Sequence, residues 1–213
     1  MQPQPAPHEP PRPVMTNAQP LPPPPEPVDG KRAADEPWRG RFWLGLRLTA
    51  AGGIGGERPS RPTVVSLGGG FDLGWRIRNW IGVGMGFSGQ VHDRAKFGVY
   101  DDYGVLRDYA YRYGNLFVWD IAYVRVFLFR GRFQPYLEGG GGMTSYYRPE
   151  GGYQIGGHVR SGVGFDGWVT PNLTLGLFAN YRMLALEQRY SDGSRDYPIG
   201  HAIVGGAEMG LHW

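Results

Sequence analysis

Hydrophobic and polar residues alternate with a period of two over most of the chain from residue 41 onward. In the segment 80–91, for example, Ile81, Val83, Met85 and Phe87 alternate with glycine, serine and glutamine. Strict alternation over about ten residues predicts β-strands with one apolar and one polar face. The eight segments that follow this pattern are 41–50, 64–76, 80–91, 116–129, 133–143, 157–169, 172–183 and 201–213.

The connections between these segments alternate in length. The tight turns are 76–79, 130–132 and 170–172, and the longer polar connections are 51–62, 92–115, 144–155 and 184–200. Short turns at one end, long loops at the other and strands of about 9–11 residues are typical of a barrel that crosses a membrane. We therefore predict an all-β fold, an eight-stranded antiparallel transmembrane β-barrel formed by residues 38–213.

The two faces of the predicted strands differ in side-chain size. One face is rich in phenylalanine, tryptophan, leucine, valine and methionine, whereas the other carries mainly glycine, serine and charged residues. Eight strands enclose a lumen only wide enough to be filled by side chains. Large apolar side chains from all eight strands would overfill it, so we expect the apolar face to point outward, where lipid is its natural solvent.

Charged residues on the inward face are expected to pair with one another. An unpaired charge in so narrow a lumen is costly, whereas a hydrogen-bonded network is tolerated. We expect this network to fill the lumen, with an ion pathway as the alternative, and Arg76 to lie at its inner rim. The expected members are Arg47, Asp72, Asp120, Glu138, Arg160, Asp166, Arg182 and Glu208.

Arg125 does not fit this pattern. By strict alternation it shares the outward face with Tyr123 and Phe127. Two explanations are open: its side chain could extend to the lipid headgroups, or a β-bulge could turn it inward.

Residues 1–37 differ in composition from the rest of the chain, since they contain 13 of its 19 prolines. Proline-rich sequence with few apolar residues favours an extended, disordered chain that cannot form a core. We predict that this segment is a disordered Pro-rich spacer. The alternative is a docking segment for a periplasmic or envelope protein partner.

Composition excludes several other classes of protein. The chain has no cysteine, which rules out disulfide scaffolds and thiolate metal sites. Its 36 glycines disfavour a helical fold. The longest uncharged stretch, 167–181, is too short for a transmembrane helix. The net charge is only +3 and the arginines are scattered, so no nucleic-acid partner is expected.

Two segments carry a resemblance to a known family. Residues 134–142 (QPYLEGGGG) resemble a segment that often opens the fifth strand of small outer-membrane barrels. Residues 207–213 (AEMGLHW) are similar to the terminal signal recognised by the outer-membrane assembly machinery, with Met209, Leu211 and Trp213 at the signal positions. The region 38–213 thus resembles the OmpA-like and OmpX-like eight-stranded barrels.

The resemblance implies a location in the outer membrane of a Gram-negative cell, in contact with outer-membrane lipids and lipopolysaccharide. An even number of strands places both termini on one side, and the short turns predict that this side is the periplasm. No cofactor or metal ion is expected.

Some small barrels of this kind are lipid A-modifying enzymes, and the deacylase kind uses a histidine and a serine two residues apart. No such pair occurs here, and His158 and Ser161 are three apart, so they face opposite sides of a strand. His92, His158 and His201 are expected near the outer rim. We therefore predict that the protein is not an enzyme.

The long connection 92–115 is the best candidate for a contact surface. Its tyrosines are interleaved with aspartate and arginine, a composition common in contact surfaces. Over a specific receptor role we favour a simple extension of the strands beyond the membrane, because residues 109–113 (YAYRY) alternate. The predicted role is structural, surface contact or anchoring of an envelope complex, with a narrow pore or a lipid A-modifying enzyme as the alternative. The tyrosines are Tyr100, Tyr103, Tyr109, Tyr111 and Tyr113.

Overall fold

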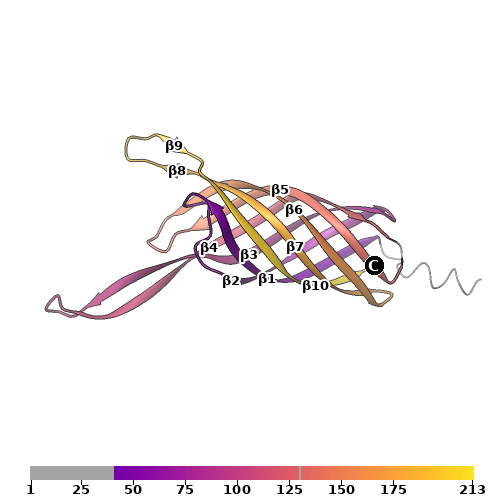
Figure 1. Cartoon of the computed structure of the whole chain (residues 1–213), viewed down its shortest axis with the longest axis horizontal. Helices are drawn as coiled ribbons and strands as arrows, with labels where there is room; N and C mark the ends of the chain where they lie inside the picture. The colour runs from indigo at the N-terminus through magenta and orange to yellow at the C-terminus, as the bar shows by residue number, and fades with distance from the viewer. Residues whose placement is uncertain (1–40, 130) are drawn as a thin grey trace, which may run out of the picture. The chain divides into compact units, whose positions relative to one another are not determined.

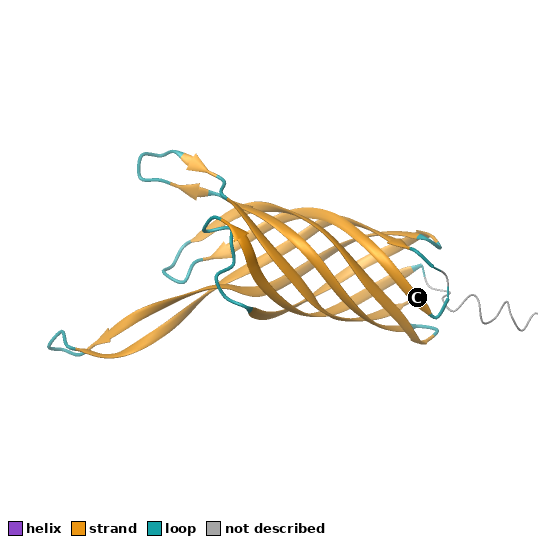
Figure 2. Ribbon diagram, viewed as in Figure 1, coloured by secondary structure: helices purple, strands orange, loops and turns teal. Residues whose placement is uncertain are grey.

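The computed structural model describes residues 41–129 and 131–213, which form a closed antiparallel barrel (Figures 1 and 2). The predicted eight-stranded all-β fold is confirmed, while the proline-rich segment 1–37 lies outside the described residues. The barrel strands are β1 (Phe42–Gly56), β2 (Ser66–Arg78), β3 (Ile81–Tyr100), β4 (Leu106–Phe127), β5 (Phe133–Tyr147), β6 (Tyr153–Thr170), β7 (Leu173–Leu186) and β10 (Ile199–His212). Two short strands, β8 (Gln188–Arg189) and β9 (Arg195–Asp196), form a separate hairpin.

Each barrel strand pairs with its neighbours in the chain, and β1 pairs with β10 to close the barrel. The two ends differ. At one end, which we call the short-turn end, the connections are 79–80, 128–132 and 171–172. The first and last strands also meet there, since the backbone N–H of Phe42 donates to the carbonyl of Trp213 at 3.1 Å. At the opposite end, the long-loop end, the strands continue into longer segments (Figure 2).

Several strands are longer than the sequence pattern predicted, mainly toward the long-loop end. Within the predicted connection 92–115, the extension of the strands beyond the barrel is observed. There β3 and β4 remain paired from Asp93 opposite Gly114 to Val99 opposite Asp108, as a two-stranded ribbon that projects from the barrel (Figure 1). The sequence signal for this extension is the alternation over 109–113 (YAYRY), in which tyrosine occupies every second position.

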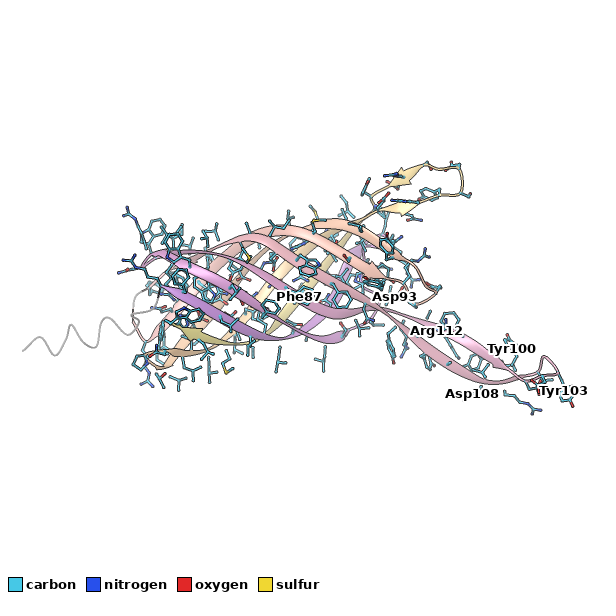
Figure 3. All side chains as sticks on the ribbon, turned by 180° about the vertical axis from the view of Figure 1, so that it is seen from behind. Phe87, Asp93, Tyr100, Tyr103, Asp108 and Arg112 are labelled. Carbon is cyan, nitrogen blue, oxygen red and sulfur yellow. The ribbon has the colours of Figure 1, made fainter. Side chains whose placement is uncertain are left out.

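The outward face of the barrel is apolar and exposed. Two groups of aromatic rings lie at different heights on this face: Phe42 stacks on Trp75 close to the short-turn end, whereas Phe87, labelled in Figure 3, contacts Phe117 and Trp119 farther along the barrel. An apolar band between two aromatic girdles is the surface of a membrane-spanning barrel. Within the part of the chain that the structure describes, no helix is long and apolar enough to span a membrane. The aliphatic side chains of the band include Leu46, Leu48, Met85, Leu137, Val163, Leu175 and Leu177.

Large aromatic side chains on the inward face are accommodated by glycines directly across the strand ladder. Tyr136 is paired with Gly164, and a Cβ atom on that glycine would overlap the tyrosine ring. The same arrangement places Trp43 opposite Gly74. These glycines are therefore required by the close approach of a ring, which explains part of the high glycine content.

Replacing Gly164 with alanine should lower the free energy of unfolding by about 1–3 kcal/mol, because the Tyr136 ring is buried and an overpacked ring must shift. Gly157→Ala on the same strand is the matched control, since the nearest atom to its Cβ would be at an ordinary 3.5 Å. Urea unfolding of both variants measures the difference. Equal stability of the two variants would show that the lumen tolerates the extra methyl group.

Candidate functional site

The position of Arg125 is decided by a β-bulge in β4. The pairing of β4 with β5 shifts register between Asp120 and Ala122. After this shift the alternation is inverted, and Arg125 is inside the barrel with only 2 % of its surface exposed. The expectation that Tyr123 and Phe127 face outward is therefore wrong, because strict alternation takes no account of the extra residue. Of the two explanations for Arg125, the bulge is the one observed.

Two arginines and two glutamates form the centre of the lumen. Arg47 lies with its Nε 2.9 Å from an oxygen of Glu208 and its Nη2 3.4 Å from Glu138. Arg125 contacts the same two carboxylates, Glu208 at 3.2 Å and Glu138 at 3.4 Å. Each glutamate thus bridges two guanidinium groups, and all four side chains are buried.

The centre is extended on its β6 side by Arg160. Its guanidinium lies 3.2 Å from both Glu138 and Asp120. Asp120 also contacts Nε2 of His158 at 2.8 Å. His158 is buried, so the prediction that it lies at the rim is wrong, since β6 begins well before it.

Asp72 and Asp166 complete the set. Asp72 lies 3.1 Å from Arg47 and accepts hydrogen bonds from the indole N–H of Trp43, at 2.9 Å, and from the hydroxyl of Tyr123. Asp166 lies 3.6 Å from Arg125. The structure therefore joins seven of the eight predicted charged residues, with Arg125 as the member that strict alternation missed.

The eighth residue, Arg182, faces the lumen but has no ion pair within 4.0 Å among the described residues. It lies directly across the ladder from Arg160. A void of about 10 Å³ lies beside these two arginines and Asp120. That is room for about one water molecule, so the network fills this level of the lumen almost completely.

Toward the long-loop end the lumen is closed by apolar side chains rather than charges. They come from β4, β5 and β7, and each has 3 % or less of its surface exposed. Three of these positions fell in the predicted polar connections 144–155 and 184–200, so the sequence pattern gave no sign of them. The cluster consists of Leu116, Val118, Tyr146, Leu184 and Leu186.

The segment 57–65 covers this apolar cluster. Ser60 is fully buried; its hydroxyl donates to the carbonyl of Pro198 and accepts from the backbone N–H of Leu186 at 2.9 Å. The carbonyl of Pro59 lies 2.8 Å from Nε2 of His92. His92 therefore lies where β3 leaves the barrel, as expected for the rim, but this segment buries it. The charged network, the apolar cluster and this segment close the lumen at three successive levels.

The ribbon formed by β3 and β4 carries the predicted tyrosines, which are 47–89 % exposed. Tyr113 and Tyr111 lie opposite Arg94 and Lys96, so these side chains share one face. The Lys96 ammonium lies 3.5 Å from the ring centroid of Tyr109, and the Arg94 guanidinium 4.8 Å from that of Tyr111. One face of the ribbon is thus a stripe of tyrosines interleaved with cations.

The turn at the tip of the ribbon is held by Asp101 (Figure 3 shows Tyr100 and Tyr103 beside it). Its carboxylate accepts from the backbone N–H of Val105 at 2.8 Å and from that of Tyr103 at 3.0 Å, and it pairs with Arg107 at 2.7 Å. The Val105 hydrogen bond, together with Arg107 and the Tyr103 N–H, holds the pKa of this carboxyl below its usual range. At neutral pH the carboxylate of Asp101 is therefore ionised and able to accept these hydrogen bonds.

The last strand places its alternate apolar residues outward. Met209, Leu211 and Trp213 are all exposed on the barrel surface at the short-turn end. No group of three histidine, aspartate or glutamate side chains within the described ranges could hold a metal ion.

Comparisons with known proteins relate the chain to others through its fold. No protein-family model and no curated protein matches it. Two crystal structures are similar. The structure of the Neisserial surface protein A has a TM-score of 0.57 and 11 % sequence identity, and the match covers 81 % of this chain and 97 % of that one. The structure of the outer membrane protein OprG of Pseudomonas aeruginosa has a TM-score of 0.53 and 10 % sequence identity, and the match covers 82 % of this chain and 97 % of that one. This chain therefore has the fold of the small eight-stranded outer-membrane β-barrels.

Proposed function

We propose that the protein is a non-enzymatic outer-membrane barrel that acts by surface contact through its projecting ribbon. The observation that carries this proposal is the combination of a lumen closed at three levels with a tyrosine-rich ribbon that extends beyond the barrel. The barrel then serves as an anchor, and the ribbon presents the contact surface.

The proposed location rests on the outward apolar band and on the two neighbours, which are described as a surface protein and an outer membrane protein. In such barrels the short turns face the periplasm and the longer loops face outward. Both ends of the barrel chain then lie on the periplasmic side, and the proline-rich residues 1–37 form a spacer there, open to an envelope partner. Lipids and lipopolysaccharide contact the band, and Met209, Leu211 and Trp213 present the assembly signal.

A pore is disfavoured by the filling of the lumen. An ion would have to displace the charged network around Glu138, then the apolar cluster, then the segment that buries Ser60. A lipid-modifying enzyme is disfavoured because His158 and Asp120 lie inside the closed lumen, whereas Ser161 faces outward. No acyl chain in the membrane reaches that histidine.

The test is site-specific photo-crosslinking on intact cells. Tyr111→p-benzoylphenylalanine in the ribbon should give discrete adducts with an outer-surface macromolecule, because its side chain is exposed on the tyrosine stripe. The matched position is Leu177 in the apolar band, where the same probe should capture lipid alone.

Absence of adducts from Tyr111, or identical adducts from both positions, would contradict the surface-contact role. The same purified protein in a planar bilayer should leave the conductance at background. A steady ion current would instead support the pore.

A further inference from the structure

We propose that a cavity at the long-loop end binds an acidic sugar, meaning a sugar residue that carries a phosphate or a carboxylate. The cavity has a volume of about 370 Å³ and is lined by residues of the three segments 57–65, 148–152 and 187–198 and of the strands β3, β5 and β6. This volume is in the range of small-molecule sites. Its charged lining residues are Arg58, Asp93, Arg148, Glu150 and Arg189.

The floor of the cavity is fixed by hydrogen bonds to the barrel. Asp93, labelled in Figure 3 where the ribbon leaves the barrel, accepts from the hydroxyl of Thr63 and from that of Tyr146, the latter at 3.5 Å. Pro59, which also lines the cavity, is held by the ring of His92. A ligand therefore meets a preorganised floor rather than a free loop.

Two of the three guanidinium groups in the wall are available for an anion. Arg58 makes no ion pair with any residue that the structure describes, and Arg148 has only a long contact of 3.8 Å with Glu150. Arg189, by contrast, is paired with Glu187 at 2.8 Å. A planar guanidinium binds phosphate or carboxylate in a two-pronged geometry, so Arg58 and Arg148 would hold the acidic group.

The remaining lining groups suit hydroxyls. The carboxylates of Asp93 and Glu150 are acceptors, and Gln154 and Gln188 add side-chain amides to the lining. Gln154 also lines an adjoining cavity of about 380 Å³, so the site can hold more than one sugar unit. Cations and acceptors together fit an acidic sugar better than an inorganic anion.

The test is calorimetric titration of the full chain in detergent micelles. Glucose 6-phosphate and glucuronate should each bind saturably, and glucose and inorganic phosphate about tenfold more weakly or not at all. Arg58→Ala and Arg148→Ala should each weaken binding of both acids by about tenfold. Arg61→Ala is the matched control, because Arg61 is exposed on the same segment but does not line the cavity.

Folding of each variant is checked by the difference in gel migration between heated and unheated samples. Three results would each overturn the proposal. They are the absence of saturable binding, unchanged binding in both arginine variants, and binding of glucose as tight as that of the two acidic sugars. Equal binding of inorganic phosphate would overturn the sugar assignment.

Competition with purified lipopolysaccharide separates two sources of the same chemistry. If lipopolysaccharide displaces the bound glucose 6-phosphate, the natural ligand is a lipid-linked sugar. If it does not, the natural ligand is a free sugar. The titration does not depend on which way the barrel faces in a membrane, so its failure would leave the surface-contact role untouched.

Discussion

Replacing Glu138 with alanine should lower the free energy of unfolding by about 3–5 kcal/mol. Glu138 contacts Arg47, Arg125 and Arg160 from one position on β5, and it is buried. Its removal takes one carboxylate away from three buried guanidinium groups. The loss of stability arises because their positive charge is then no longer balanced inside the lumen. Reversible urea unfolding in lipid vesicles measures this loss.

Two variants sharpen the result. Glu150→Ala removes an exposed glutamate of the long-loop end and should change stability by less than about 1 kcal/mol. Glu138→Gln keeps the size and one acceptor oxygen, so it should fall between the wild type and Glu138→Ala. If Glu138→Ala is as stable as Glu150→Ala, the ion pairs add nothing to the stability of the barrel.

Replacing Leu177 with arginine should destabilise the barrel in lipid by about 2–4 kcal/mol. Leu177 lies on the outward face of β7 with 65 % of its surface exposed. On a water-facing surface the same change would be nearly neutral. The substitution therefore measures directly whether lipid covers this band.

The matched control is Leu106→Arg on the ribbon, which should alter stability by no more than about 0.5 kcal/mol. Both substitutions place the same charge on an exposed leucine, and only the position relative to the band differs. Equal effects of the two substitutions would refute the membrane-spanning assignment of the band.

The outward face and the number of strands could be predicted from the sequence because they depend on a strict period of two. Leu173, Leu175 and Leu177 alternate with threonine and glycine, and no tertiary contact is needed to interpret that pattern. The short turns were predicted for the same reason, since they interrupt the alternation with polar residues.

The lumen could be predicted only in part. Its charged residues stand out among glycines, but the bulge after Asp120 carries no residue type that marks it. Arg125 was the one residue that indicated the bulge, because strict alternation would have placed its charge on the apolar outward face. The apolar cluster around Leu184 escaped prediction because a strand that leaves the membrane loses its apolar outward face while its inward face remains buried.

The pairing of Arg47 with Glu208 has a consequence for how the barrel is made. These residues belong to the first and last barrel strands, lie opposite one another in the ladder and are separated by 161 positions along the chain. Contacts of such long range form late, after the entropy of closing the chain has been lost. Until β1 pairs with β10, the Arg47 guanidinium lacks the Glu208 carboxylate, so an open sheet has one ion pair fewer than the closed barrel. Closing the seam between these strands therefore does more than pair two backbones, because it brings the carboxylate of Glu208 to the guanidinium group of Arg47 inside the lumen.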